Sequence, residues 1–174
     1  ATRAKEELDR RGRGALNELI ALFPGRLHVD VFTMAPPLPD ARNCSPVLRA
    51  LAALGSSCLP ALAPLFQHPG AEIRFYATYL LSEMVDASAL PYVAKALHDV
   101  EAAVRRVAVL VAGRFRELSE FAELIEELRE ELRSPDVNRC KVAMNALAAL
   151  GDRETLPFLA PLLENRRGDL SEAA

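Results

Sequence analysis

Hydrophobic residues recur every three or four positions along most of this chain, which is the spacing of an amphipathic helix rather than a strand. One stretch shows the pattern clearly, with apolar side chains at Ile73, Ala77, Leu80, Leu81 and Met84. Turn residues interrupt the pattern at regular intervals and divide it into pairs of helices. The predicted first helices of the pairs are 45–54, 71–85, 101–116 and 136–150. The predicted second helices are 57–67, 87–98, 119–133 and 153–165.

Glycines and prolines mark the ends of these helices. Gly55 and Gly151 each follow a predicted first helix, where a residue with positive φ is favoured. Three prolines lie in the first turn of second helices, where their missing N–H costs nothing: Pro60, Pro91 and Pro157. Residues that can cap the second helices precede them, at Ser56, Asp86, Ser119 and Asp152. Pro64 and Pro161 lie deeper in their helices, so we expect both to distort them.

The sequence also repeats itself. Residues 50–66 read ALAALGSSCLPALAPLF and residues 146–163 read ALAALGDRETLPFLAPLL, at an offset of 96 that becomes 97 after a one-residue insertion. A weaker copy, LPYVAKAL at 90–97, begins 31 residues after Leu59. The spacing indicates helical hairpins of about 32 residues. Because such hairpins stack on one another, we predict an all-α fold, an α-solenoid of about four hairpins.

Two motifs connect these hairpins with a known family. The pattern Ile73-Arg74…Ala77 returns as Val104-Arg105…Ala108, and residues 150–163 combine Leu-Gly-Asp with a Leu-Pro…Leu run. Over roughly residues 45–165 the chain resembles HEAT repeats of the bacterial, phycobilisome-lyase-like type. In the fourth unit, Arg139-Cys140 stands where the resemblance implies a Val-Arg pair. The resemblance is specific for the fold and says little about function.

The resemblance also implies a role for polar residues that recur in the repeat. In HEAT proteins such residues form a polar ladder between neighbouring repeats, and here Arg74, Asp99 and Arg105 occupy the positions. We therefore predict a structural role for these three residues. Binding of an anion or a partner is the alternative.

The single predicted domain, 1–174, contains segments outside the repeats. We expect residues 1–23 to form a helical cap, 24–43 an extended insert, 44–165 the repeats and 166–174 a tail. Alternating residues at 27–32 predict a short strand in the insert, and nearby prolines favour extended backbone. The insert is either a strap that shields one end of the stack or a functional loop.

Composition and charge narrow the range of functions. Half of the residues are hydrophobic (51%) and a quarter are charged (26%), which is typical of a folded globular domain. The net charge of −3 argues against nucleic-acid binding, which needs a basic face. No run of about 18 apolar residues is present, so no membrane span is predicted. Cys44, Cys58 and Cys140 lack metal-site spacing and are expected to be buried thiols in a reducing compartment.

The sequence contains no catalytic motif. It lacks the spacings of a nucleophile elbow, a zinc-protease motif, a P-loop, a dinucleotide fingerprint and an EF-hand. His68 and His98 end successive second helices, where a cation favours the helix dipole. His28 with Asp30 is a weak signal for a pair of metal ligands. We therefore predict no catalytic residue, no metal and no cofactor.

The predicted helix 119–133 is unusually acidic. From 117 to 136, eight acids and two arginines give a net charge of −6, twice that of the whole chain. Its expected buried stripe consists of Phe121, Leu124, Ile125, Leu128 and Leu132. Second helices line the concave side of HEAT-like solenoids, so we assign partner binding to Glu120, Glu123, Glu127 and Glu130, together with Tyr92 and Lys95. Such a face would attract a basic partner, and a merely solvated face is the alternative.

The sequence therefore predicts a non-catalytic protein–protein interaction scaffold, a module of a larger cytoplasmic bacterial protein with further repeats or domains. Two other functions remain open. A subunit of a tetrapyrrole (phycobilin) lyase-like enzyme would need a pigment pocket. A HEAT-like DNA-repair glycosylase would need a basic concave face and aromatic contacts, and the absence of Trp and the acidic third unit argue against it.

Overall fold

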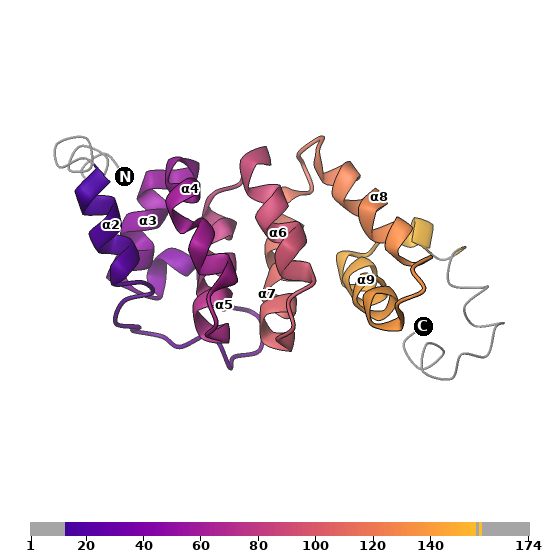
Figure 1. Cartoon of the computed structure of the whole chain (residues 1–174), viewed down its shortest axis with the longest axis horizontal. Coiled ribbons are helices and arrows are strands. Elements are labelled where there is room, and N and C mark those ends of the chain that lie inside the picture. Colours follow the sequence, from indigo (N-terminus) through magenta and orange to yellow (C-terminus); the bar gives the residue numbers. More distant parts are fainter. Residues whose placement is uncertain (1–12, 156, 158–174) are drawn as a thin grey trace. The chain divides into compact units, whose positions relative to one another are not determined.

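The computed structural model describes residues 13–155 and residue 157 (Figure 1). Within these residues every regular element is a helix and there is no strand, so the predicted all-α fold of helical hairpins is confirmed. The predicted tail, 166–174, and residues 1–12 of the predicted cap lie outside the described residues. The part of the cap that is described contains α2 (Arg13–Ala21).

The helices lie within the predicted segments. The first helices of the hairpins are α3 (Pro46–Leu54), α5 (Ala71–Leu80), α7 (Ala102–Ala112) and α9 (Val137–Leu150). The second helices are α4 (Leu59–Leu62) continued by the 3₁₀ helix η3 (Ala63–Gln67), α6 (Leu90–Leu97) and α8 (Phe121–Glu131). The fourth second helix is described only at its beginning, as the 3₁₀ helix η7 (Arg153–Thr155).

Glycine and proline act where the sequence predicts. Gly55 and Gly151 have φ of +62° and +73°, and each ends its helix. At Pro64 the α-helix changes to the tighter 3₁₀ helix η3, because proline removes a hydrogen-bond donor inside the helix. Pro161 lies outside the described residues.

The predicted capping residues behave differently from one another. Asp86 accepts a hydrogen bond from the backbone N–H of Ser88 and begins the 3₁₀ helix η5 (Ala87–Ala89). Ser119 instead donates its hydroxyl to the carboxylate of Glu120. Ser45 is a capping residue that was not predicted: its hydroxyl accepts a hydrogen bond from Leu48 N at 3.0 Å and caps α3.

The chain divides into two compact units, Ala1–Arg114 and Phe115–Ala174. In the first unit, α5 packs against both α3 and α7, and α6 packs against α5 and α7. In the second unit, α8 packs against α9. The boundary falls between α7 and α8, so the third predicted hairpin is divided between the two units.

The predicted strand at 27–32 is wrong. These residues form turns and bends, because the helical core offers no strand edge with which they could pair. Other partners satisfy their backbone N–H groups: His28 N donates to Cys44 O at 2.8 Å, and Val31 N donates to the Tyr76 hydroxyl at 3.0 Å. The Val31 side chain is fully buried.

The insert 24–43 packs along the chain's own first helices. Phe32 contacts Phe75 of α5 edge-to-face, with ring centroids 5.2 Å apart. Arg106 of α7 donates to the carbonyl of Phe32, and the Tyr79 hydroxyl of α5 donates to that of Pro39. Figure 1 shows the insert passing from α2 along α5 to α7. The insert is therefore a strap over the first helices of its own unit.

One stretch of the described residues, Pro46–Gln67, is long and apolar enough to cross a membrane by length and composition alone. Its backbone turns at Gly55, where α3 ends and the second half of the hairpin begins. Leu48, Leu51 and Leu62 within it are fully buried in the protein. In this fold the stretch forms the first hairpin.

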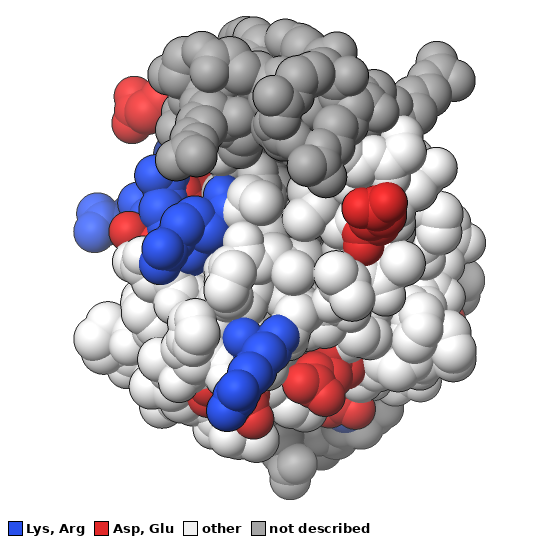
Figure 2. All heavy atoms as spheres, turned by 90° about the vertical axis from the view of Figure 1, so that its left-hand side faces the viewer, with Lys and Arg blue, Asp and Glu red and all other residues white. Residues whose placement is uncertain are grey.

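The end of the first unit that carries α2 has a mostly uncharged surface. Viewed from this end (Figure 2), lysine and arginine side chains form small groups beside acidic ones and are separated by uncharged residues. The described residues of this face therefore form no continuous basic surface of the kind that binds a phosphate backbone.

Candidate partner-binding site

The predicted acidic face lies on α8 in the second unit. Glu120, Glu123, Glu127 and Glu130 are all exposed, and their spacing of three, four and three residues places them on one side of the helix. Leu124 and Leu128 are buried on the neighbouring side of the helix, and α8 packs against α9. The apolar stripe thus fixes the direction in which the glutamates face. We call these four residues the glutamate stripe.

The arginine inside α8 does not neutralise the glutamate stripe. Arg129 donates from Nε and Nη2 to the two carboxylate oxygens of Asp152, at 2.8 and 2.5 Å. It also pairs with Glu126 at 2.5 Å. For Glu123, Glu127 and Glu130, the described residues provide no ion-pair partner. Among the described residues, no cation therefore neutralises these three glutamates.

The pair Arg129–Asp152 was not predicted from the sequence. Hydrogen bonds from Arg129 hold the pKa of Asp152 below its ordinary value, against the opposing effect of burial. Asp152 directly follows the helix-ending Gly151, and Arg129 is one of two basic residues in a run of acids. Those two signals could have suggested the pair, but the contact between residues 23 apart follows only from the packing of α8 on α9.

The predicted ladder residues lie in the first unit. Arg74 of α5 donates from Nε and Nη2 to both carboxylate oxygens of Asp99, at 2.7 and 2.8 Å, and so links one repeat to the next. Arg105 of α7 instead donates to the backbone carbonyls of Asp99 and Val100, at 2.8 and 2.9 Å. Arg74 makes the equivalent bonds to the carbonyls of His68 and Pro69. Both arginines thus fix the loop that precedes their own helix.

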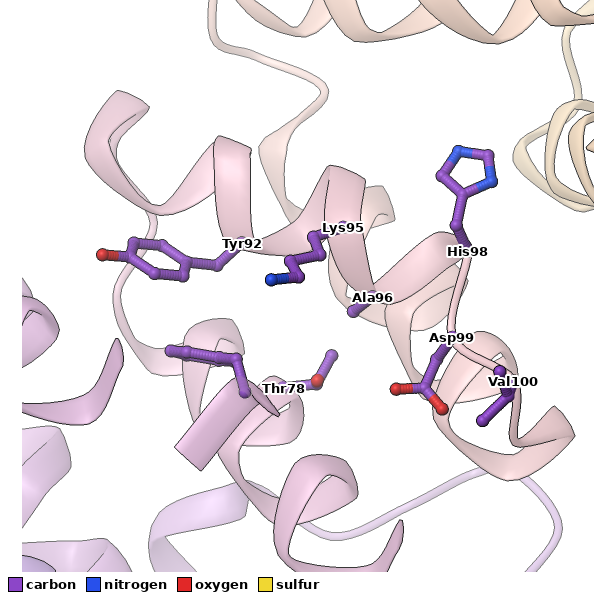
Figure 3. A pocket seen from close by; sticks show the side chains of 8 residues that line it. Thr78, Tyr92, Lys95, Ala96, His98, Asp99 and Val100 are labelled. Atoms are coloured by element: carbon purple, nitrogen blue, oxygen red, sulfur yellow. The ribbon is translucent and has the colours of Figure 1, made fainter. Parts of the chain in front are cut away.

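Tyr92 and Lys95 line one pocket in the first unit (Figure 3), with a volume of about 360 Å³. The ring of Tyr92 packs against Phe66 with centroids 4.7 Å apart. Tyr92 and Lys95 both extend from α6, above Thr78 of α5. Asp99 and Val100 complete the far end. The structure therefore brings two predicted partner-binding residues together with one ladder residue, whereas the glutamate stripe belongs to the second unit.

Comparison with known proteins bears on the fourth hairpin. Residues 141–165 match the family model "PBS lyase HEAT-like repeat". This part of the chain is therefore similar to a HEAT-like repeat. The match begins at residue 141 in the second turn of α9 and continues beyond the described residues. No curated protein and no solved structure matches the chain.

The matched HEAT-like repeat is the one whose Val-Arg pair is replaced. Arg139, at the valine position, is exposed and pairs with Glu131 at 2.7 Å. Cys140, at the arginine position, is buried. In the preceding repeat the first residue of the pair, Val104, is buried and the second, Arg105, is half-buried. In the fourth repeat the first residue is the exposed one and the second is buried.

The cysteines and histidines of the HEAT-like repeats form no reactive cluster. All three cysteines are free and buried, as predicted. Burial raises the pKa of Cys58 to about 11, which keeps its thiol protonated and unreactive. Among the residues that the structure describes, no three potential metal ligands come together. His68 and His98 follow η3 and α6, the equivalent positions that the repeat predicts, and both are exposed.

Proposed function

We propose that this HEAT-like repeat chain is a non-catalytic scaffold module that binds a basic segment of a partner protein on the glutamate stripe. We further propose that it acts in the cytoplasm as part of a larger bacterial protein. The observation that carries the proposal is the exposed glutamate stripe on the solvent side of α8, whose Glu123, Glu127 and Glu130 have no ion-pair partner among the described residues.

The stripe is unfavourable for the helix itself. Like charges three or four residues apart destabilise a helix by about 0.2–0.5 kcal/mol per pair. Within α8 the stripe contains such pairs between Glu123 and Glu127 and between Glu127 and Glu130. The one basic side chain within α8 points to Asp152 instead of relieving them. A basic partner would relieve this repulsion and would also be steered to the site by charge.

A charge-reversal variant tests the proposal. Glu123→Lys with Glu127→Lys should weaken partner capture from native lysate by about tenfold or more at low salt, because attraction becomes repulsion. Glu18→Lys with Glu72→Lys is the matched control, since both residues are exposed and the net charge changes equally. Quantitative mass spectrometry of the captured proteins, with crosslinks mapped to α8, measures the effect.

The expected result is a basic protein retained by the native chain and by the control variant but lost by the α8 variant. Its capture should also fall as salt concentration rises, because salt screens exposed charges. If the α8 variant captures the same proteins in the same amounts as the native chain, the glutamate stripe is a solvated surface and the proposal fails.

The family name supports a second candidate, a subunit of a tetrapyrrole lyase-like enzyme. Incubation of the chain with a phycobilin, followed by visible absorbance, separates the two functions. The scaffold proposal predicts an unchanged absorbance spectrum. A stable spectral shift of the bilin would favour the lyase-like function instead.

A further inference from the structure

The pocket between η3, α5 and α6 has an apolar wall and one uncommitted cation. Phe66, Tyr92, Ala96 and Val100 supply the apolar surface. Lys95 is exposed, and the described residues provide no ion-pair partner for it. It follows Tyr92 by three residues on α6, so both side chains lie on the same side of the helix (Figure 3).

The other polar groups of the pocket already have partners. The Thr78 hydroxyl donates to the carbonyl of Arg74 at 2.8 Å. The Asp99 carboxylate accepts two hydrogen bonds from Arg74 and one from the backbone N–H of Glu101. The ring of His98 points away from Tyr92 and Lys95. The groups left for a ligand are therefore the Lys95 ammonium and the Tyr92 hydroxyl, both of which can donate to an anionic acceptor.

The rim indicates an occupant that is longer than the pocket. Val100 is 91% exposed and forms part of the lining, so apolar contact continues from the pocket onto the surface. A volume of about 360 Å³ lies near the lower end of the range for ligand pockets, about 300–1,000 Å³, and suits a single large side chain. A polypeptide that inserts one side chain and runs over Val100 fits both features.

We propose that this pocket binds a segment of a partner protein in which a large apolar residue is adjacent to an acidic one. The apolar side chain lies in the pocket against Phe66 and Tyr92, the polypeptide continues over Val100, and the carboxylate lies on the Lys95 ammonium. This inference rests on the proposed role of the chain as a protein-binding module. Its site belongs to the first unit, whereas the glutamate stripe belongs to the second, so the two sites can be tested separately.

The test titrates the ¹⁵N-labelled full chain with an acetylated, amidated tetrapeptide that contains adjacent phenylalanine and glutamate. Amidation leaves the glutamate side chain as the only carboxylate. We expect saturable NMR shift changes at Thr78, Tyr92 and Val100, with a Kd of about 1 mM or tighter. A peptide with glutamine in place of glutamate, and the variant Lys95→Met, should each weaken binding about fivefold, which is the effect of one partly exposed charge pair.

Lys141→Met is the matched control, because it removes one lysine charge from the second unit and should leave the affinity unchanged. The variant Glu123→Lys with Glu127→Lys should also bind the peptide normally, even where it loses its basic partner. Equal affinity for the glutamate and glutamine peptides, an unchanged affinity in Lys95→Met, or no shifts at the pocket residues would overturn the inference.

Discussion

At the scale of single residues, the ion pair between Arg74 and Asp99 joins two successive repeats. Both side chains are only about one-tenth exposed, at 11% and 10%. Burial by itself would raise the pKa of Asp99, but hydrogen bonds from Arg74 and from the Glu101 N–H, with the charge of Arg74, lower it below its ordinary value. Arg74 is therefore the main group that keeps the Asp99 carboxyl charged in the folded protein.

Arg74→Met should lower the free energy of unfolding by about 2 kcal/mol at neutral pH, because it leaves the Asp99 carboxylate largely buried without its cation. Urea unfolding followed by circular dichroism measures the change. Arg114→Met provides the control, since Arg114 and its partner Asp40 are 60% and 56% exposed. The control should cost less than about 1 kcal/mol.

The loss of stability caused by Arg74→Met should depend on pH. A lowered carboxyl pKa in the folded state contributes stability above the ordinary pKa of aspartate, about 3.9, and the contribution is lost as the pH falls through the folded value. The difference in stability between the native chain and Arg74→Met should therefore be full at pH 7 and shrink below about pH 4. A difference that stays constant from pH 7 to pH 3 would show that the pair does not stabilise the fold through its charge.

At the scale of elements, the end of α9 depends on the backbone conformation of Gly151. Its φ is +73° and its ψ is +29°, the left-handed region. An added Cβ there would meet no heavy atom within 4 Å, so a substitution tests the conformation alone. Gly113, at the end of α7, has equally open space but a φ of −58°.

We therefore expect opposite effects from the same change at the two glycines. Gly151→Ala should lower the free energy of unfolding by about 1 kcal/mol, because an L-residue is strained at positive φ. Gly113→Ala should be neutral or stabilise by up to about 1 kcal/mol, because alanine restricts the unfolded chain. Thermal unfolding of the two variants compares them, and an equal loss in both would mean that φ at Gly151 is not what makes glycine necessary.

At the scale of the whole molecule, the strap 24–43 is joined to helix α5 of its own unit through Tyr76. The Tyr76 side chain is fully buried, accepts a hydrogen bond from Val31 N and donates one to Asp30 at 2.9 Å. Burial raises the pKa of Tyr76, so its hydroxyl remains protonated and can keep both bonds. One hydroxyl thus replaces the sheet partner that the strap lacks.

Tyr76→Phe should lower the free energy of unfolding by about 2 kcal/mol, because the buried N–H of Val31 loses its acceptor. The strap should also open more often, which limited trypsin digestion would detect as faster cleavage after Arg26 and Arg42. Tyr92→Phe is the control: it removes a hydroxyl from a half-exposed ring, so it should change neither the free energy of unfolding nor the rate of cleavage in the strap. Cleavage of the strap at the native rate in Tyr76→Phe would mean that other contacts hold it in place.

The sequence by itself determined the helices, their order and the helix ends marked by Gly55 and Gly151, because hydrophobic spacing and positive-φ glycines act over a few residues. It also determined which side of α8 is charged, since the buried leucines and exposed glutamates follow from one helical period. Only the tertiary structure decided contacts between distant residues. The strap is irregular because α5 and α7 provide side chains rather than a strand edge as hydrogen-bond partners. Arg129 pairs with Asp152 because α8 packs on α9. Tyr92 and Lys95 share a pocket with Asp99 because α6 packs on α5.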